Sequence, residues 1–302
     1  MRLAVSFLSA ALLAGCVSVA THGDPAASAA AAQSSASSAY VVQAPPPNDD
    51  LNATVWFQTS VERDLVFRQV YGAAAAHLGA ALADKSWDAL PKGDRSNDPS
   101  GLPPAIIVDV DETVLDNSPE QVRQIVDDKP FNDADWNAWV QQAAAKPLPG
   151  AVEFLSAAAA KGVTVFYVSN READQAEATV ANLRKAGFPI ADANQFLGKG
   201  TVVEGCQGTG SPKDCRRQLV GRTHRVLMQF GDQVGDFIHT ADNSPAGRRA
   251  AVEPSLDWVG ERWWTLPNPM YGAWEPALFG NDWSLSPVQQ RAAKEAALDD
   301  AR

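Results

Sequence analysis

The sequence predicts an α/β fold in which a Rossmann-like parallel sheet is flanked by helices and joined by a smaller, mostly helical subdomain. Residues 105–108 are an unbroken run of aliphatic and β-branched side chains, typical of a strand buried on both faces of a parallel sheet, and the mainly apolar segments 163–168 and 225–230 predict two further buried strands. Helical patterns cover 149–161 and 172–186, with Gly162 and Gly187 after them. Strands that alternate with helices indicate βαβ units.

The N-terminus reads as an export signal. Arg2 precedes an apolar run, residues 3–14, which is too short to span a bilayer. The run ends in Leu13-Ala14-Gly15-Cys16, which resembles the lipobox of bacterial lipoproteins and implies cleavage before Cys16 and lipidation of that residue. Val17 and Ser18 follow without an Asp that would indicate retention in the inner membrane. A secreted protein with a chance cysteine is the alternative.

Three segments follow from this reading. Residues 1–15 are predicted to be a lipoprotein signal peptide. Residues 16–47 are rich in Ala, Ser and Pro without periodicity, which predicts a disordered tether. Residues 48–302 form the predicted folded domain, which begins near Asn48-Asp49-Asp50, a plausible helix cap.

The domain is expected to begin with one long amphipathic helix or two packed ones over residues 51–83. Apolar residues recur there at helical spacing: Leu51, Val55, Leu65, Val66 and Val70. A segment after Asn117, with Trp136 and Trp139, is expected to be a helical insertion that overhangs the strand ends. Residues 263–266 predict a further strand, and a polar helix starts near Ser286.

Residues 195–215 are Gly-rich and are expected to be irregular. They contain Cys206 and Cys215. In an oxidising periplasm these two cysteines are expected to form a disulfide. A metal pair is the alternative, but it lacks nearby His or Cys partners at ligand spacing, His224 being the nearest histidine.

Carboxylates gather after the first strand, where Asp109, Asp111 and Glu112 follow one another closely. A strand extended through Asp109 and Asp111 would point both side chains the same way, and like charges that close repel unless a cation or a shared proton intervenes. The pattern predicts a divalent metal, a division of acid and base roles, or both. A solvated turn is the ordinary alternative. A calcium loop would require Gly where Val114 stands, and a helix before it.

Polar residues also follow the other two strands: Ser169 after the second, and Asp232 and Asp236 after the third. Because the carboxyl ends of parallel strands lie side by side, these groups are expected to converge with Asp109 and Asp111. Lys213 stands at the start of a predicted short helix. Each of these residues alone could have an ordinary structural role: Ser169 as a helix cap, Asp232 and Asp236 in a turn, and Lys213 as a surface charge.

Together these motifs resemble the four-motif pattern of the haloacid dehalogenase superfamily of phosphotransferases. Within that superfamily, the segments DVDETVLDN, YVSNRE, GDQVGDF and PNPMYGAWE, with Lys213 and the Arg216-Arg217 pair, look like the class C acid phosphatases. Those enzymes are bacterial lipoprotein phosphatases of the outer membrane. The resemblance implies a haloacid dehalogenase-like domain that is lipid-anchored there, facing the periplasm or the surface.

The resemblance also implies roles for single residues. Asp109 would be the nucleophile that forms an aspartyl-phosphate, and Asp111 the general acid and base. Mg²⁺ would be held by Asp109, the backbone carbonyl of Asp111 and Asp232, with Asp236 orienting a metal-bound water. The remaining roles are phosphoryl binding by Ser169 and Lys213, with Lys199 as the substitute lysine, and an aromatic substrate clamp by Tyr271.

The predicted activity is hydrolysis of small phosphomonoesters such as nucleoside 5′-monophosphates and aryl phosphates. The alternative is a surface lipoprotein that binds a phosphorylated or aromatic ligand without turnover. The formal net charge of −11 and the sequence pI near 4.8 argue against a nucleic acid polymer as partner. The sequence does not decide between a monomer and a homo-oligomer.

Overall fold

The computed structural model describes residues 48–301. The predicted signal peptide, Cys16 and the predicted tether lie outside the described residues. Within residues 48–301, no helix combines the length and the apolar character needed to cross a membrane.

The centre of the domain is a five-stranded sheet in the order β5-β4-β1-β6-β7, whose neighbouring strands are all parallel. Its strands are β1 (Pro104–Val108), β4 (Thr164–Glu172), β5 (Phe196–Lys199), β6 (Arg225–Gly231) and β7 (Trp263–Thr265). A separate antiparallel pair joins β2 (Leu115–Asp116) to β3 (Lys146–Pro147). The three strands predicted for the centre of the sheet are confirmed, since β1 lies between β4 and β6.

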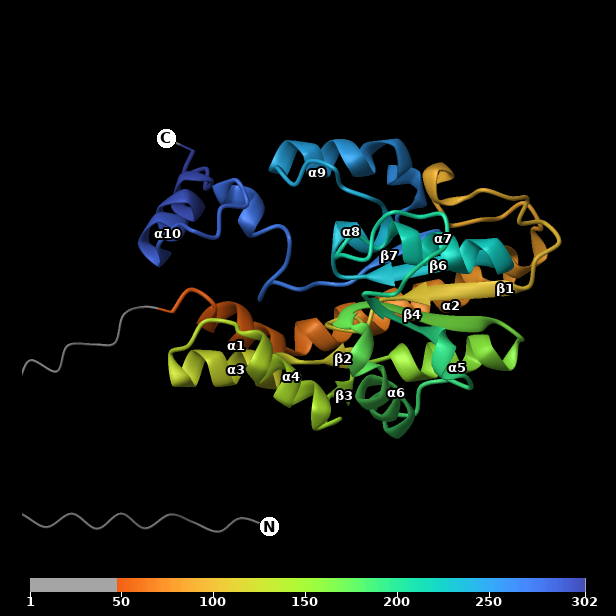
Figure 1. The fold of residues 1–302 in the computed structure, drawn as a ribbon, viewed down its shortest axis with the longest axis horizontal. Helices are drawn as coiled ribbons and strands as arrows, with labels where there is room; N and C mark the ends of the chain where they lie inside the picture. Colours follow the sequence, from red (N-terminus) through yellow and green to blue (C-terminus); the bar gives the residue numbers. More distant parts are fainter. Residues whose placement is uncertain (1–47, 302) are drawn as a thin grey trace, which may run out of the picture. The chain divides into compact units, whose positions relative to one another are not determined.

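Helices cover both faces of this sheet (Figure 1). The α-helices are α1 (Leu51–Thr59), α2 (Val61–Ala83), α3 (Ser118–Asp127), α4 (Asp133–Gln141), α5 (Ala151–Ala160), α6 (Ala176–Lys185), α7 (Asp214–Thr223), α8 (Val234–Phe237), α9 (Pro245–Val252) and α10 (Pro287–Ala296). Short 3₁₀ helices are η1 (Lys92–Asp94), η2 (Ala173–Gln175), η3 (Ala193–Gln195), η4 (Glu253–Trp258) and η5 (Pro276–Phe279). Figure 1 shows α5 and α6 on one side of the sheet and α7 on the other.

Strand β1 shows why its residues are apolar throughout. Ile106 and Val108 belong to the large core shared with α2, α5 and α6, whereas Ala105 and Ile107 pack in a second core that includes Val220 of α7. Alternate side chains of a strand point to opposite faces, so a strand covered on both sides must be apolar at every position.

Two sequence expectations are wrong in this part of the chain. The N-terminal segment forms two helices that meet at Ser60, which was one of the two alternatives, but of the five apolar residues that suggested its amphipathic pattern only Val70 packs against the core. Leu51, Val55 and Leu65 are exposed (Leu65 at 59%), and the buried face carries mainly aromatic and small residues: Thr54, Phe57, Arg63, Phe67, Tyr71, Ala74, Leu78 and Ala81. The second error is β5, because residues 196–199 were expected to be irregular and instead form the edge strand beside β4.

The smaller helical part consists of α1, α3 and α4 together with the β2-β3 pair (Figure 1). The side-chain amide of Gln58 in α1 donates to the Ser118 hydroxyl at the start of α3, at 3.0 Å. Trp139 of α4 is buried and donates its indole N–H to Asn117, at 2.8 Å. Since Asn117 ends the segment that follows β1, this helical part is attached directly to the carboxyl edge of the sheet.

Candidate active site

The carboxyl edge of the sheet brings the predicted site residues together. Strand β1 ends at Val108, and the Asp109 N–H still donates to the Phe230 carbonyl of β6, at 2.9 Å. Ser169 lies inside β4 and Asp232 directly follows β6. The register of three neighbouring parallel strands therefore places these side chains at one edge, as expected for ligand sites in open α/β sheets.

Lys213 lies between two carboxylates of this edge. Its Nζ donates to Asp109 Oδ1 at 2.5 Å and to Asp236 Oδ1 at 2.6 Å, and all three residues are buried. Lys199 instead pairs with Glu172 at 2.6 Å on a partly exposed surface. The structure therefore places Lys213, and not Lys199, next to the predicted nucleophile.

Asp111 has different neighbours from Asp109. Its Oδ1 accepts hydrogen bonds from Arg171 Nε at 2.9 Å and Asn117 Nδ2 at 2.8 Å, while its Oδ2 accepts one from the Ser169 hydroxyl at 3.2 Å. Strand β1 ends at Val108, before both aspartates. The expectation that the Asp109 and Asp111 side chains point the same way from one extended strand therefore does not apply. The two aspartates are thus held by separate sets of partners.

A set of carboxylates at this edge fits a hard divalent cation. One oxygen each from Asp109, Asp232 and Asp236 lies within 4.8 Å of the others. Asp232 Oδ2 is oriented by Gln233 Nε2 at 2.8 Å and Asn268 Nδ2 at 2.9 Å. An all-oxygen donor set of this kind suits Mg²⁺. Asp236 already bonds Lys213 and the Gln233 N–H, so it is less free to bind an ion directly.

Gly231 allows this arrangement at the end of β6. A β-carbon there would lie 2.2 Å from Asp236 Oδ2, a distance that no side chain can occupy. Any larger residue would displace the Asp236 carboxylate from Lys213. The first glycine of the GDQVGDF segment is therefore required by close packing against Asp236.

The electrostatics of the site favour a bound cation. Burial first, and then the neighbouring Asp236, raise the pKa of Asp232 to about 7. Burial likewise raises the pKa of Asp109 well above its usual range, although Lys213 opposes this. Burial alone would lower the pKa of Lys213, but Asp109 and Asp236 raise it overall, so the lysine stays charged. The ionised carboxylates need more positive charge than Lys213 supplies.

Tyr271 contacts the loop that carries the two central aspartates. Its hydroxyl donates to Glu112 Oε2, and its ring packs against the core while remaining half-buried. Glu112 has a left-handed backbone (φ 53°), and its other carboxylate oxygen accepts the Asn117 N–H at 2.7 Å. The predicted clamp residue is therefore tied to the loop that carries Asp109 and Asp111. Its stacking on a substrate stays a prediction.

Sequence reasoning assigned no role to Arg171, Asn117 or Glu112, all of which are buried here. Arg171 and Asn117 belong to the segments YVSNRE and DVDETVLDN, so their closeness to the motif residues was the available signal. The position of an arginine near the end of a strand does not show whether its side chain is buried or exposed. Only the packing of α4 and α6 over this loop decides it.

The predicted disulfide is present: Cys206 is bonded to Cys215, with their Cα atoms 5.7 Å apart. Cys215 is the second residue of α7, and Lys213 immediately precedes that helix. The bridge thus ties the Gly-rich segment to the helix start that carries the site lysine. The alternative of a metal pair at these cysteines does not hold.

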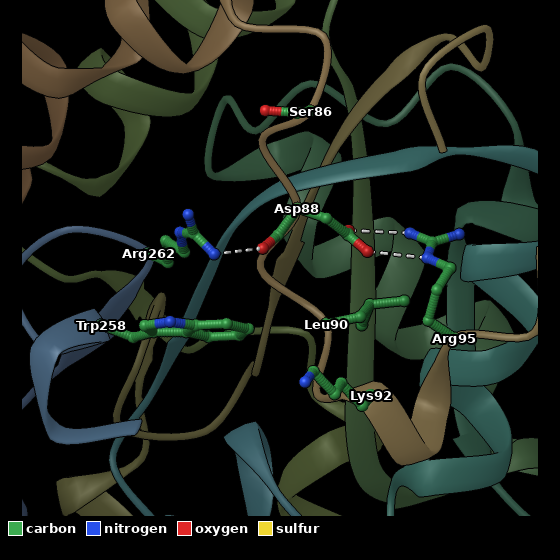
Figure 2. A pocket seen from close by; sticks show the side chains of 7 residues that line it. All are labelled: Ser86, Asp88, Leu90, Lys92, Arg95, Trp258 and Arg262. Carbon is green, nitrogen blue, oxygen red and sulfur yellow. Dashed lines mark hydrogen bonds and ion pairs between the residues drawn. The ribbon is translucent and has the colours of Figure 1, made fainter. Parts of the chain in front are cut away.

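A cavity of about 280 Å³ elsewhere in residues 48–301 does not share this chemistry (Figure 2). Arg95 makes two hydrogen bonds to the Asp88 carboxylate, at 2.7 and 2.8 Å, and Arg262 donates to the Asp88 carbonyl oxygen at 3.1 Å. Trp258 and Leu90 also line it. The residues that line it include none of the predicted site residues, so this cavity is separate from the carboxylates of Asp109, Asp232 and Asp236.

Comparisons with known proteins identify the family of this chain. The family model for the HAD superfamily, subfamily IIIB (Acid phosphatase) matches residues 33–274. The chain therefore belongs to this acid phosphatase family of the haloacid dehalogenase superfamily. The class C resemblance and the predicted fold class are confirmed.

A solved structure of the class C acid phosphatase from Bacillus anthracis is 34% identical, covers 83% of this chain and 97% of that one, and has a TM-score of 0.71. Acid phosphatase 1 from Solanum lycopersicum is 27% identical over 165 residues, and a stem 31 kDa glycoprotein from Glycine max is 27% identical over 166 residues. These two matches cover 55% of this chain, and 57% and 58% of the two relatives. The chain thus spans somewhat more than half the length of these curated relatives.

Proposed function

We propose that this protein is a Mg²⁺-dependent acid phosphatase that hydrolyses small phosphomonoesters, such as nucleoside 5′-monophosphates and aryl phosphates, through an aspartyl-phosphate. The observation that carries the proposal is the buried Asp109-Lys213-Asp236 cluster, with Asp111 held separately beside it. The family supports it. So does a second structure of the Bacillus anthracis enzyme, which is 33% identical and has tungstate bound, since tungstate is a tetrahedral oxyanion like phosphate.

In the proposed first step, an Asp109 carboxylate oxygen attacks phosphorus, the bond to the ester oxygen breaks, and Asp111 gives its proton to the departing oxygen. In the second step water attacks the aspartyl-phosphate and loses a proton to Asp111. Phosphate leaves, and both aspartates return to their starting states. Two carboxylates with separate partners suit this division of work.

The cation-binding residues would be Asp109, Asp232 and the backbone carbonyl of Asp111, with Asp236 orienting a metal-bound water. Mg²⁺ held there would offset negative charge on the phosphoryl oxygens. Lys213 Nζ would bind a phosphoryl oxygen while keeping Asp109 ionised. The Ser169 hydroxyl would turn from Asp111 to donate to another phosphoryl oxygen, and Tyr271 would stack against the leaving group.

The experiment that tests this proposal measures phosphate released from a nucleoside monophosphate and from 4-nitrophenyl phosphate, with Mg²⁺ and with a chelator. Release of phosphate from both esters with Mg²⁺, lost on chelation and restored by added Mg²⁺, is the expected result. Ligand binding without any release would instead support the alternative of a binding lipoprotein. Release that survives exhaustive chelation would contradict the metal requirement.

The effect of Mg²⁺ on thermal stability should depend on pH. The raised pKa of Asp232, about 7, means that the metal-free folded state retains a proton that the unfolded state has already lost. Its stability therefore falls as pH rises from about 4 to about 7. Mg²⁺ replaces that proton, so the rise in Tm on adding Mg²⁺ should be larger at pH 8 than at pH 5. Each ~1 kcal/mol of additional stabilisation by the metal should add about 3 °C to that rise. Scanning calorimetry with and without Mg²⁺ checks this, and an equal rise at both pH values would contradict it.

We also propose that the protein is exported and lipid-anchored through Cys16 to the bacterial outer membrane, in the periplasm or on the surface. The Leu13-Ala14-Gly15-Cys16 segment and the resemblance to outer-membrane lipoprotein phosphatases support this. Cys16→Ser should move the protein from the membrane fraction to the soluble fraction. Retention of the variant with the membranes would rule out this anchor.

A further inference from the structure

The two oxygens of the Asp111 carboxylate have different surroundings. Oδ1 accepts from Arg171 Nε at 2.9 Å and from Asn117 Nδ2 at 2.8 Å. Among the described residues, Oδ2 accepts only from the Ser169 hydroxyl, at 3.2 Å. A hydroxyl hydrogen can rotate toward another acceptor, whereas the guanidinium and amide donors are fixed by their planes. Oδ1 is therefore immobilised and Oδ2 is the oxygen that can exchange partners.

The Arg171 guanidinium is itself fixed by hydrogen bonds and by an aromatic ring. Its Nη1 donates to Thr179 Oγ1 at 3.3 Å and its Nη2 donates to Asn117 Oδ1 at 3.1 Å. The guanidinium lies 5.5 Å from the ring centre of Trp136 in α4. With only 1% of its surface exposed, Arg171 has no face toward a substrate. Within residues 48–301, its one charged partner is Asp111.

We propose that Arg171, together with Asn117, is a positioning residue for the acid–base carboxylate. By fixing Oδ1 it leaves Oδ2 as the atom that gives a proton to the departing ester oxygen and later takes one from the attacking water. This inference rests on the proposed role of Asp111. A planar guanidinium reaches Asp111, Asn117 and Thr179 together, which a lysine ammonium cannot do with the same geometry.

The test compares single-turnover release of the leaving group in wild type and Arg171→Lys, with Mg²⁺ present. For a nucleoside monophosphate, whose leaving alkoxide needs a proton, the rate constant should fall about 10- to 100-fold, a part of what general acid catalysis contributes. For 4-nitrophenyl phosphate, whose leaving group is stable as an anion, it should fall less than about 3-fold. The ester concentration at half-maximal rate should stay unchanged for both.

The matched control is Arg225→Lys. Arg225 is equally buried, at 1% exposure, but it lies at the amino end of β6 and donates to the Ala81 and Asp84 carbonyls. This variant should lose stability without changing the ratio of the two rates. Comparing it with Arg171→Lys separates the effect of losing any buried arginine from the effect of losing the arginine beside Asp111.

A double-mutant cycle gives the sharper result. If Arg171 acts through Asp111, then adding Arg171→Lys to Asp111→Asn should change nucleotide cleavage by less than about 2-fold. Equal fold-losses in both backgrounds, equal losses for both esters, or a loss confined to the half-saturating concentration would each overturn the proposal. If Arg171→Lys does not fold, Asn117→Ala removes the other donor to Oδ1 and is judged by the same criteria. A wild-type protein that releases no phosphate from either ester would refute the proposed function instead.

Discussion

Asp109→Asn is expected to abolish phosphate release from every ester, by at least about 10⁴-fold, because loss of a catalytic nucleophile costs that much in other enzymes. The amide keeps the shape of the side chain and can still contact Thr113 Oγ1, which lies 3.2 Å from Asp109 Oδ2. It cannot form an acyl phosphate, and it removes one of the negative charges that would hold Mg²⁺ and Lys213. Phosphate release and trapping of a phosphorylated protein measure the effect.

Asp128→Asn is a matched control for this substitution. Asp128 is exposed and has a left-handed backbone (φ 51°), a conformation that Asn adopts readily. The control should retain the wild-type rate. A substantial residual rate in Asp109→Asn, with a phosphorylated protein still trapped, would show that another residue is the nucleophile.

Asp111→Asn is expected to act selectively according to the leaving group. The backbone carbonyl that would bind Mg²⁺ remains, so metal binding should survive, but the proton donor is lost. An alkoxide leaving from a nucleoside needs the proton, and general acid catalysis is worth typically about 10²–10⁴-fold. The loss for nucleoside monophosphates should therefore greatly exceed the loss for 4-nitrophenyl phosphate.

The comparison must be made on single-turnover release of alcohol or phenol. Asp111 is also the proposed base for the second step, so steady-state rates would combine both effects. Mg²⁺ binding should be verified by the Tm rise that the metal produces. Equal losses for the two esters, with Mg²⁺ still bound, would falsify the acid role of Asp111.

Local sequence determined the central strands and the motif residues at their ends. Runs such as residues 105–108 have no polar position, as expected of a strand that is covered on both faces. Parallel strands that share a sheet also share an edge, so Asp109, Ser169 and Asp232 converge once those strands are recognised. That inference needs no knowledge of loops or helices.

The edge strand β5 could not be recognised in this way. It is short, and Gly198 in its centre is a residue that usually weakens a strand. The structure explains the glycine, since a β-carbon there would lie 2.8 Å from the Arg171 carbonyl oxygen of the neighbouring chain segment. A close backbone approach between segments far apart in sequence leaves no local pattern.

The inward face of α1 and α2 was decided by tertiary packing. Apolar residues occur on both sides of these helices, so their spacing alone did not choose between them. The structure buries Phe67 and Tyr71, and Tyr71 stacks on Phe230 of β6 with ring centres 5.3 Å apart. The flat rings fit the surface of the sheet, and Leu65 is left in solvent.

The sequence by itself thus predicted which carboxylates gather at the edge of the sheet, because their spacing after each strand is local. The tertiary structure alone decided how they are supported. It placed Lys213 between Asp109 and Asp236, and it buried Arg171 against Asp111. The physical reason is that an ion pair's partner and its removal from water depend on chain segments distant in sequence, and folding alone brings these together.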